Sequence, residues 1–153
     1  MSTTVSIENL SGEEAPDPDS IRTWVAAAVG DERNQAEVDI CLVDETQGAE
    51  LNQRYRNKTG PTNVLSFAAD LPPDVPMPLL GEIVICAPVV AREAVEQSKS
   101  AQAHWAHMVV HGTLHLLGYD HIEEGDAVIM EARETKIMTS LGFAAPYPEL
   151  LPA

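Results

Sequence analysis

Along the 153 residues of the chain, apolar and polar positions alternate with two different periods. A two-residue alternation, typical of strands with one buried face, predicts strands at 3–9 and 36–44. Short apolar runs at 62–70 and 81–87 predict two more strands. The segment between them, DLPPDVPMPLLG (70–81), contains four prolines and is predicted to be a loop. Because this connection is short, the two strands are expected to pair antiparallel.

The second period, that of an α-helix, predicts five helices, at 21–29, 45–56, 88–100, 101–118 and 122–142. Start signals support three of them: Asp19 or Ser20 before the first, Asp44 before the second, and Pro88 in the first turn of the third. The fourth helix is apolar on almost all sides and should be buried at the centre. The order βαβαββααα predicts an α+β sandwich in a single domain, 1–153: a small mixed four-stranded sheet packed with about five helices.

The charge of the chain limits the kinds of partner that it can bind. The formal net charge of −15 argues against a broad nucleic-acid or membrane-binding surface. Three of the nine basic residues, however, lie within five positions, at Arg54, Arg56 and Lys58, and such a spot can hold a phosphate. No apolar run approaches the roughly 20 residues of a membrane span, and the first residues lack the pattern of a signal peptide, so the expectation is a cytoplasmic protein. Cys41 and Cys86 are expected to be buried thiols.

All five histidines fall between positions 104 and 121. His111 and His115 are one helical turn apart, the spacing at which two imidazoles bind one metal ion. Gly118 can end the helix and turn the chain, so that His121 returns as a third ligand. Asp120 could hydrogen-bond the second nitrogen of a ligating ring. Three protein ligands describe an open, catalytic type of site, whereas the alternative is a set of core histidines satisfied by hydrogen bonds.

The remaining two histidines, His104 and His107, share a helical stripe with His111 and His115. They could be outer groups of the metal site, a proton relay, or ordinary polar contacts near the helix start. The pattern also matches that of metzincin proteases, H-E-x-x-H-x-x-G-x-x-H, except that Gly112 replaces the glutamate that serves as general base. A protease is therefore disfavoured.

Four segments carry a resemblance to a known family. They are HGTLHLLGYDH (111–121), LNQRYRNKTGPTNVLSF (51–67), LLGEIVIC (79–86) and AHWAHMVVHG (103–112). Together they resemble the YbeY family of bacterial endoribonucleases and ribosomal RNA maturation factors. The likeness covers most of the chain and is weak over the first forty residues and after Gly142.

The resemblance implies a zinc ion, one per chain, held by His111, His115 and His121, and a functional arginine at Arg56. It also implies a single-strand-specific endoribonuclease acting in 16S ribosomal RNA 3′-end maturation, ribosome biogenesis and ribosome quality control. Its partners would be 16S ribosomal RNA and the ribosome or small-subunit proteins, with an assembly GTPase as a further candidate. The histidine spacing alone predicts only an open metal site of the hydrolytic type.

The basic block allows two interpretations. Arg56 could bind phosphate, because a guanidinium can meet two phosphoryl oxygens as negative charge develops, or the block could be a solvated helix end. We therefore take Arg56 and His111 as the candidate catalytic residues. Tyr55 could stack on a base or simply pack. The side chains at Thr62, Asn63 and Ser66 are candidates for a polar wall.

Two other functions compete with an endoribonuclease. The first is a non-catalytic ribosome-assembly factor whose zinc site is structural. The second is a metzincin-like metalloprotease, against which Gly112 counts.

Overall fold

The computed structural model describes residues 2–69, 78–120 and 122–147. One four-stranded sheet runs through it in the order β1-β2-β4-β3. Its strands are β1 (Ser2–Asn9), β2 (Gln35–Val43), β3 (Val64–Ala68) and β4 (Leu79–Cys86). The pairs β1–β2 and β2–β4 are parallel, and β3 runs antiparallel to β4 at the sheet edge. The mixed sheet and the antiparallel pair are both confirmed.

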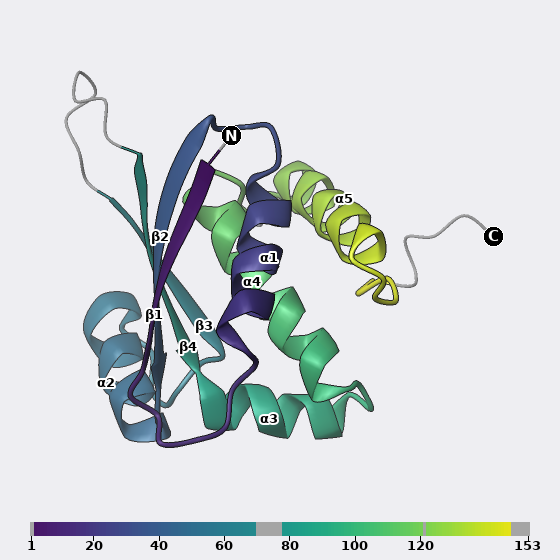
Figure 1. Ribbon diagram of the computed structural model, residues 1–153. Helices are drawn as coiled ribbons and strands as arrows, with labels where there is room; N and C mark the ends of the chain where they lie inside the picture. The colour runs from purple at the N-terminus through teal and green to yellow at the C-terminus, as the bar shows by residue number, and fades with distance from the viewer. Residues whose placement is uncertain (1, 70–77, 121, 148–153) are drawn as a thin grey trace.

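Within the described residues, five helices pack around this sheet: α1 (Pro18–Val29), α2 (Glu45–Arg56), α3 (Ala87–Glu96), α4 (Ala101–Leu116) and α5 (Glu124–Ser140). In Figure 1, α2 lies on one side of the sheet, whereas α1, α4 and α5 lie on the other. The α+β sandwich predicted from the element order is therefore confirmed.

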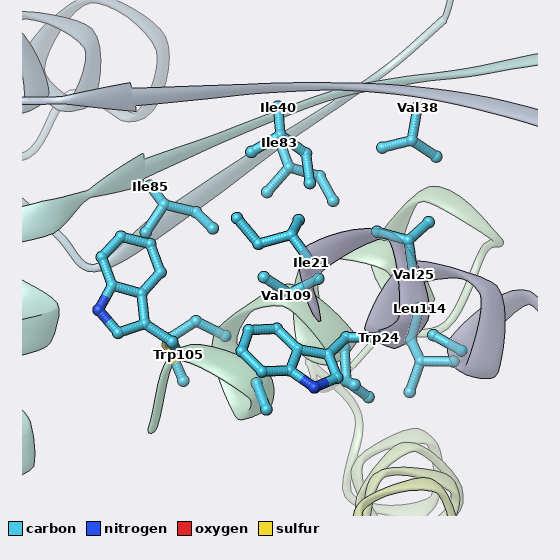
Figure 2. Close-up of a cluster of buried hydrophobic side chains, with 14 of the residues drawn as sticks. Ile21, Trp24, Val25, Val38, Ile40, Ile83, Ile85, Trp105, Val109 and Leu114 are labelled. Carbon is cyan, nitrogen blue, oxygen red and sulfur yellow. The ribbon is translucent and has the colours of Figure 1, made fainter. Parts of the chain in front are cut away.

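The larger core lies between the sheet and the pair α1 and α4. Alternate residues of β2 and β4 point into it, and Figure 2 shows Ile40 and Ile83 facing α1 and α4 across the layer. Trp24 of α1 and Trp105 of α4 supply its largest side chains, each 4% exposed. On the opposite face, a smaller apolar cluster that includes Leu65, Val84 and Cys86 lies between the sheet and α2. As predicted, α4 is the buried central helix.

Most element boundaries differ from the prediction by one to four residues, the largest shift being at the end of α3, which stops at Glu96 instead of 100. Helix α1 begins at Pro18, three residues before the predicted start, with Asp17 in place of Asp19 or Ser20 at the N-cap. The reason is that proline has the dihedral angle of a first helical residue and needs no amide partner there. Strand β4 begins at Leu79, so the predicted loop 70–81 is too long at its end; residues 70–77 lie outside the described part of the chain.

Two smaller features complete the fold. Cys86 is buried as predicted, whereas Cys41 is only half-buried. Across residues 2–69, 78–120 and 122–147, no helix has the length and apolar character needed to cross a membrane.

Candidate metal centre

A cleft of about 680 Å³ opens between the edge strand β3 and the second half of α4. Its lining includes Arg56 and Lys58, from the end of α2 and the loop that follows. It also includes His111 and His115 of α4, and Asp120 from just beyond the helix. Residues separated by more than fifty positions are thus brought to one cavity, and they include both described members of the predicted histidine set together with the predicted arginine.

The two cleft histidines lie against each other. The ring centroids of His111 and His115 are 4.7 Å apart, with an interplanar angle of 81°. Their side chains project from successive turns of a helix whose other faces are packed, so their positions are held by the core rather than by a loop. Two imidazole rings placed in this way could bind one metal ion.

Helix α4 ends in a turn that leads the chain toward these rings. Gly118 adopts a left-handed conformation with φ of 105°, as expected from its position after the helix. Its amide donates to the carbonyl of His115, and the amide of Tyr119 donates to the carbonyl of Leu114. This pair of bonds is a Schellman motif. Asp120 follows in the cleft, and the next residue, His121, lies outside the described residues, so its role as third ligand stays a prediction.

Within the described ranges, which omit position 121, no set of three or more His, Cys, Asp or Glu side chains is arranged to hold a metal ion. The described donors nevertheless suit a transition metal, because imidazole nitrogens are ligands for zinc and its neighbours. The ligand set His111, His115 and His121 thus remains a prediction.

The side chain of Glu134, on α5, contacts two histidines of α4 from inside the protein. Its Oε1 lies 2.5 Å from Nδ1 of His111, and its Oε2 lies 2.9 Å from Nε2 of His107. The side chain is 1% exposed. Burial alone would raise the pKa of the Glu134 carboxyl, but the hydrogen bonds from His107 and His111 outweigh it and lower that pKa to about 2. An ionised carboxylate therefore accepts hydrogen bonds from two histidines of α4.

Glu134 was not among the residues predicted from the sequence, and Asp120 was the residue predicted to make this kind of contact. The partner of Nδ1 of His111 is Glu134, and a contact of Asp120 with another ligating ring stays a prediction. A signal was present: Met130, Ile137 and Met138 are all buried, and Glu134 lies on the same helical face. A glutamate on the apolar face of a helix needs a buried partner.

A second buried histidine contact lies at the start of α4. His104 is 2% exposed, and its Nε2 is 2.9 Å from Oε1 of Glu93 on α3. The same carboxylate accepts a hydrogen bond of 3.1 Å from the amide of Asn63, which lines the cleft. Burial lowers the pKa of His104, and its hydrogen bond to Glu93 opposes that shift. His104 therefore contributes to a structural contact between α3, α4 and the segment before β3.

Gly112 packs directly on the sheet. A Cβ atom at this position would lie 2.9 Å from Cγ2 of Ile83 and 3.2 Å from Oγ of Ser66. The Ser66 hydroxyl in turn donates to the carbonyl of Gly112 at 3.0 Å. The glutamate of the metzincin pattern would therefore meet β4 at this position.

Of the other predicted residues that line the cleft, some are exposed to solvent and others are held by contacts within the protein. Tyr55 is 58% exposed, and its ring contacts the Phe67 ring at a centroid distance of 5.0 Å. Arg56 is exposed at the end of α2, where Asn57 closes the helix in a left-handed conformation. The predicted polar wall of Thr62, Asn63 and Ser66 does line the cleft. Asn63 and Ser66, however, bind other protein groups there.

Comparison with known proteins identifies the family. The family described as Endoribonuclease YbeY matches residues 6–142. The chain belongs to this family. A YbeY protein of Methylococcus capsulatus, named Endoribonuclease YbeY, is 55% identical over 148 residues, covering 97% of each chain. A second one, from Cellvibrio japonicus and bearing the same name, is 50% identical over 142 residues, covering 92% of this chain and 80% of the relative.

The fold of this YbeY-family chain is also found in a solved structure. The solution structure of TM1509 from Thermotoga maritima matches with a TM-score of 0.62 and 27% identity. The match covers 95% of this chain and 91% of that one. The family expected from the resemblance and the fold predicted from the order of elements are thus confirmed.

Proposed function

We propose that this chain is a metal-dependent, single-strand-specific endoribonuclease that acts on ribosomal RNA in the cytoplasm. Its role would be in 16S ribosomal RNA 3′-end maturation, ribosome biogenesis and ribosome quality control. The observation that carries the proposal is the cleft, whose lining brings together Arg56, Lys58, His111 and His115. Membership of a family described as an endoribonuclease supports the reaction class.

The residues that would hold the metal are His111, His115 and His121. Zinc suits them best, because three imidazoles form an open tetrahedral site. Zinc, when bound, supplies a Lewis acid that stabilises charge on a phosphodiester and lowers the pKa of water. His111, as a predicted ligand, is the histidine whose orientation is set from within the core, through Glu134.

The protein's own groups supply the remaining chemistry. Cleavage of a phosphodiester builds negative charge on the phosphoryl oxygens, and the planar guanidinium of Arg56 can donate to two of them. Exposed Tyr55, held from one side by Phe67, offers a ring on which an unpaired base can stack. Stacking of this kind requires a base that is not in a duplex, which supports a single-stranded substrate.

The charge of the protein bears on its partners. With a net charge of −15, phosphate attraction is confined to a small basic spot. We therefore propose that the ribosome or small-subunit proteins bring the 16S ribosomal RNA to the cleft. An assembly GTPase is a further candidate partner.

The deciding experiment compares cleavage of a single-stranded 16S ribosomal RNA segment by wild type and by His115→Ala, purified identically. Wild type should carry about one zinc ion per chain and cleave the RNA; His115→Ala should lose both. It should also melt at a lower temperature, because a metal bound only by the folded state stabilises that state. Equal cleavage by both proteins would point to a contaminating nuclease.

Two other results would change the function. Metal-loaded wild type that binds small subunits but leaves RNA intact would favour the non-catalytic assembly factor with structural zinc. Wild type without any transition metal, after purification without chelators, would contradict the metal site. A metalloprotease is not proposed, because the position of its general base is occupied by Gly112, packed against Ile83.

A further inference from the structure

Glu134, whose side chain is 1% exposed, joins two histidines of α4 from a neighbouring helix. We propose that Glu134 is a positioning residue for the metal site: it holds His111 in the tautomer that carries its proton on Nδ1 and its lone pair on Nε2. This inference rests on the metal site of the proposed function.

The geometry assigns the tautomer. A carboxylate only accepts hydrogen bonds, so each ring nitrogen that contacts it must carry a proton. Oε1 of Glu134 contacts Nδ1 of His111, and the proton of the neutral ring is therefore on Nδ1. Its lone pair is then on Nε2, the nitrogen that a ligand to zinc has to offer. A carboxylate on the second nitrogen also raises the basicity of a ligating ring.

The second oxygen of Glu134 explains why a glutamate fits this position. Oε2 contacts Nε2 of His107, which is 7% exposed and also lies 3.3 Å from the Tyr147 hydroxyl. The carboxylate thus accepts from two donors at once, one on each oxygen. Because His107 and His111 are a turn apart on α4, this fixes the position of Glu134 and hence the rotation of the His111 ring.

A purely structural role would also place Glu134 here, since the contact attaches α5 to α4. The two roles differ in what a glutamine would do. An amide has one accepting oxygen and one donating nitrogen, so it cannot accept from both histidines. In Glu134→Gln, one of the two rings must change its tautomer or lose its hydrogen bond, although size and packing are preserved.

The experiment combines two measurements on the full chain. The first is the ¹⁵N shift of the His111 ring nitrogens in metal-free wild type, which reports the tautomer directly. The second is the affinity for Zn²⁺, measured by competition with a chromogenic chelator, for wild type, Glu134→Gln and Glu131→Gln. Glu131 lies on the same helix, so its glutamine variant is matched in charge and helix position.

We expect wild-type His111 to be protonated on Nδ1 and Glu134→Gln to bind Zn²⁺ about 10–100-fold more weakly, with Glu131→Gln unchanged. A folded Glu134→Gln that binds Zn²⁺ as tightly as wild type would overturn this inference alone. If the variant does not fold, the wild-type tautomer decides, and a proton on Nε2 of His111 would overturn the inference. Wild type that binds no Zn²⁺ would overturn the metal site and the inference together.

Discussion

The first and second halves of α4 use the same contact for different purposes. In each half a histidine binds a carboxylate from a neighbouring helix: His104 binds Glu93 of α3, and His111 binds Glu134 of α5. The His104 side chain is 3% exposed, whereas that of His111 is 20% exposed and lines the cleft. A contact between a histidine and a carboxylate is therefore no sign of function by itself; what distinguishes the two pairs is the cleft that the His111 ring lines.

The second partner of each carboxylate sharpens this difference. Glu93 also accepts from Asn63, in the segment before β3, so it connects three parts of the chain. Glu134 also accepts from His107, so both of its bonds go to α4. The first contact joins α3, α4 and the segment before β3, whereas the second joins α5 to two side chains of α4. Variants in the two halves should accordingly separate stability from activity.

The largest effect is expected on the cleft side, from Arg56→Ala. Because Arg56 is exposed, its loss should leave fold and metal content intact. RNA cleavage should fall by about 10²–10³-fold, the scale of one preorganised donor to a developing oxyanion, or about 2.7–4 kcal/mol. Single-turnover cleavage at saturating RNA measures it. Arg56→Lys should recover little, since lysine offers a point charge instead of a planar fork.

The matched control for this prediction is Arg54→Ala. Arg54 is exposed on the same helix, outside the lining of the cleft. It should retain nearly all activity. The opposite result, with Arg54→Ala inactive and Arg56→Ala active, would mean that the phosphate ligand has been assigned to the wrong residue.

Much of this arrangement could be predicted from periodicity. The β2 alternation placed Val38, Ile40 and Leu42 on one face, and all three are buried. The predicted start of α1 is wrong because Asp17 is the N-cap and Pro18 follows it in the first helical position. Local signals of this kind require only the neighbouring residues, which is why the elements could be placed without any tertiary information.

The contacts of the site were harder to predict, for a physical reason. Glu134 lies in a sequence crowded with charges, ARETK (132–136), which has the composition of a solvent-exposed helix face. Only the packing of α5 on α4 buries it. Gly112 was interpreted as a missing catalytic glutamate, whereas its lack of a side chain allows α4 to approach Ile83. Both features depend on which helix faces meet, and periodicity does not specify that.

On the structural side of the comparison, Glu93→Ala should destabilise the protein by about 1–3 kcal/mol, because it leaves the buried Nε2 of His104 without an acceptor. Urea unfolding in a chelator would measure the change. Glu96→Ala, at an exposed position of the same helix, is the control and should stay within about 0.5 kcal/mol. Metal content should not change in either protein. Loss of metal without loss of stability would show that the two halves of α4 are not separate in purpose.

A smaller effect is expected from Tyr55→Ala. If a base of the substrate stacks on this ring, binding of single-stranded RNA should weaken toward the lower end of about 1–3 kcal/mol, because the ring is 58% exposed. Fluorescence anisotropy with a labelled oligonucleotide would measure it, and Tyr55→Phe, which keeps the ring, should bind like wild type. Equal weakening in both variants would assign the effect to the hydroxyl instead of stacking.

The smallest expected effect is the pH dependence of stability that arises from His104. Burial lowers the pKa of its imidazole, and the Glu93 bond opposes this without cancelling it. The unfolded chain therefore binds a proton more readily than the folded one, so the free energy of unfolding should decrease as pH falls through about 6.5. His104→Gln keeps a donor for Glu93 and removes the titrating group. Its stability should thus decrease less than that of wild type between about pH 7.5 and pH 5.

Both proteins are unfolded by urea in a chelator, so that metal release contributes to neither curve, and the other four histidines are common to both. Parallel curves would mean that the Glu93 bond balances burial. A steeper decrease in the variant would mean that His104 is protonated in the folded protein, and the contact would then be an ion pair.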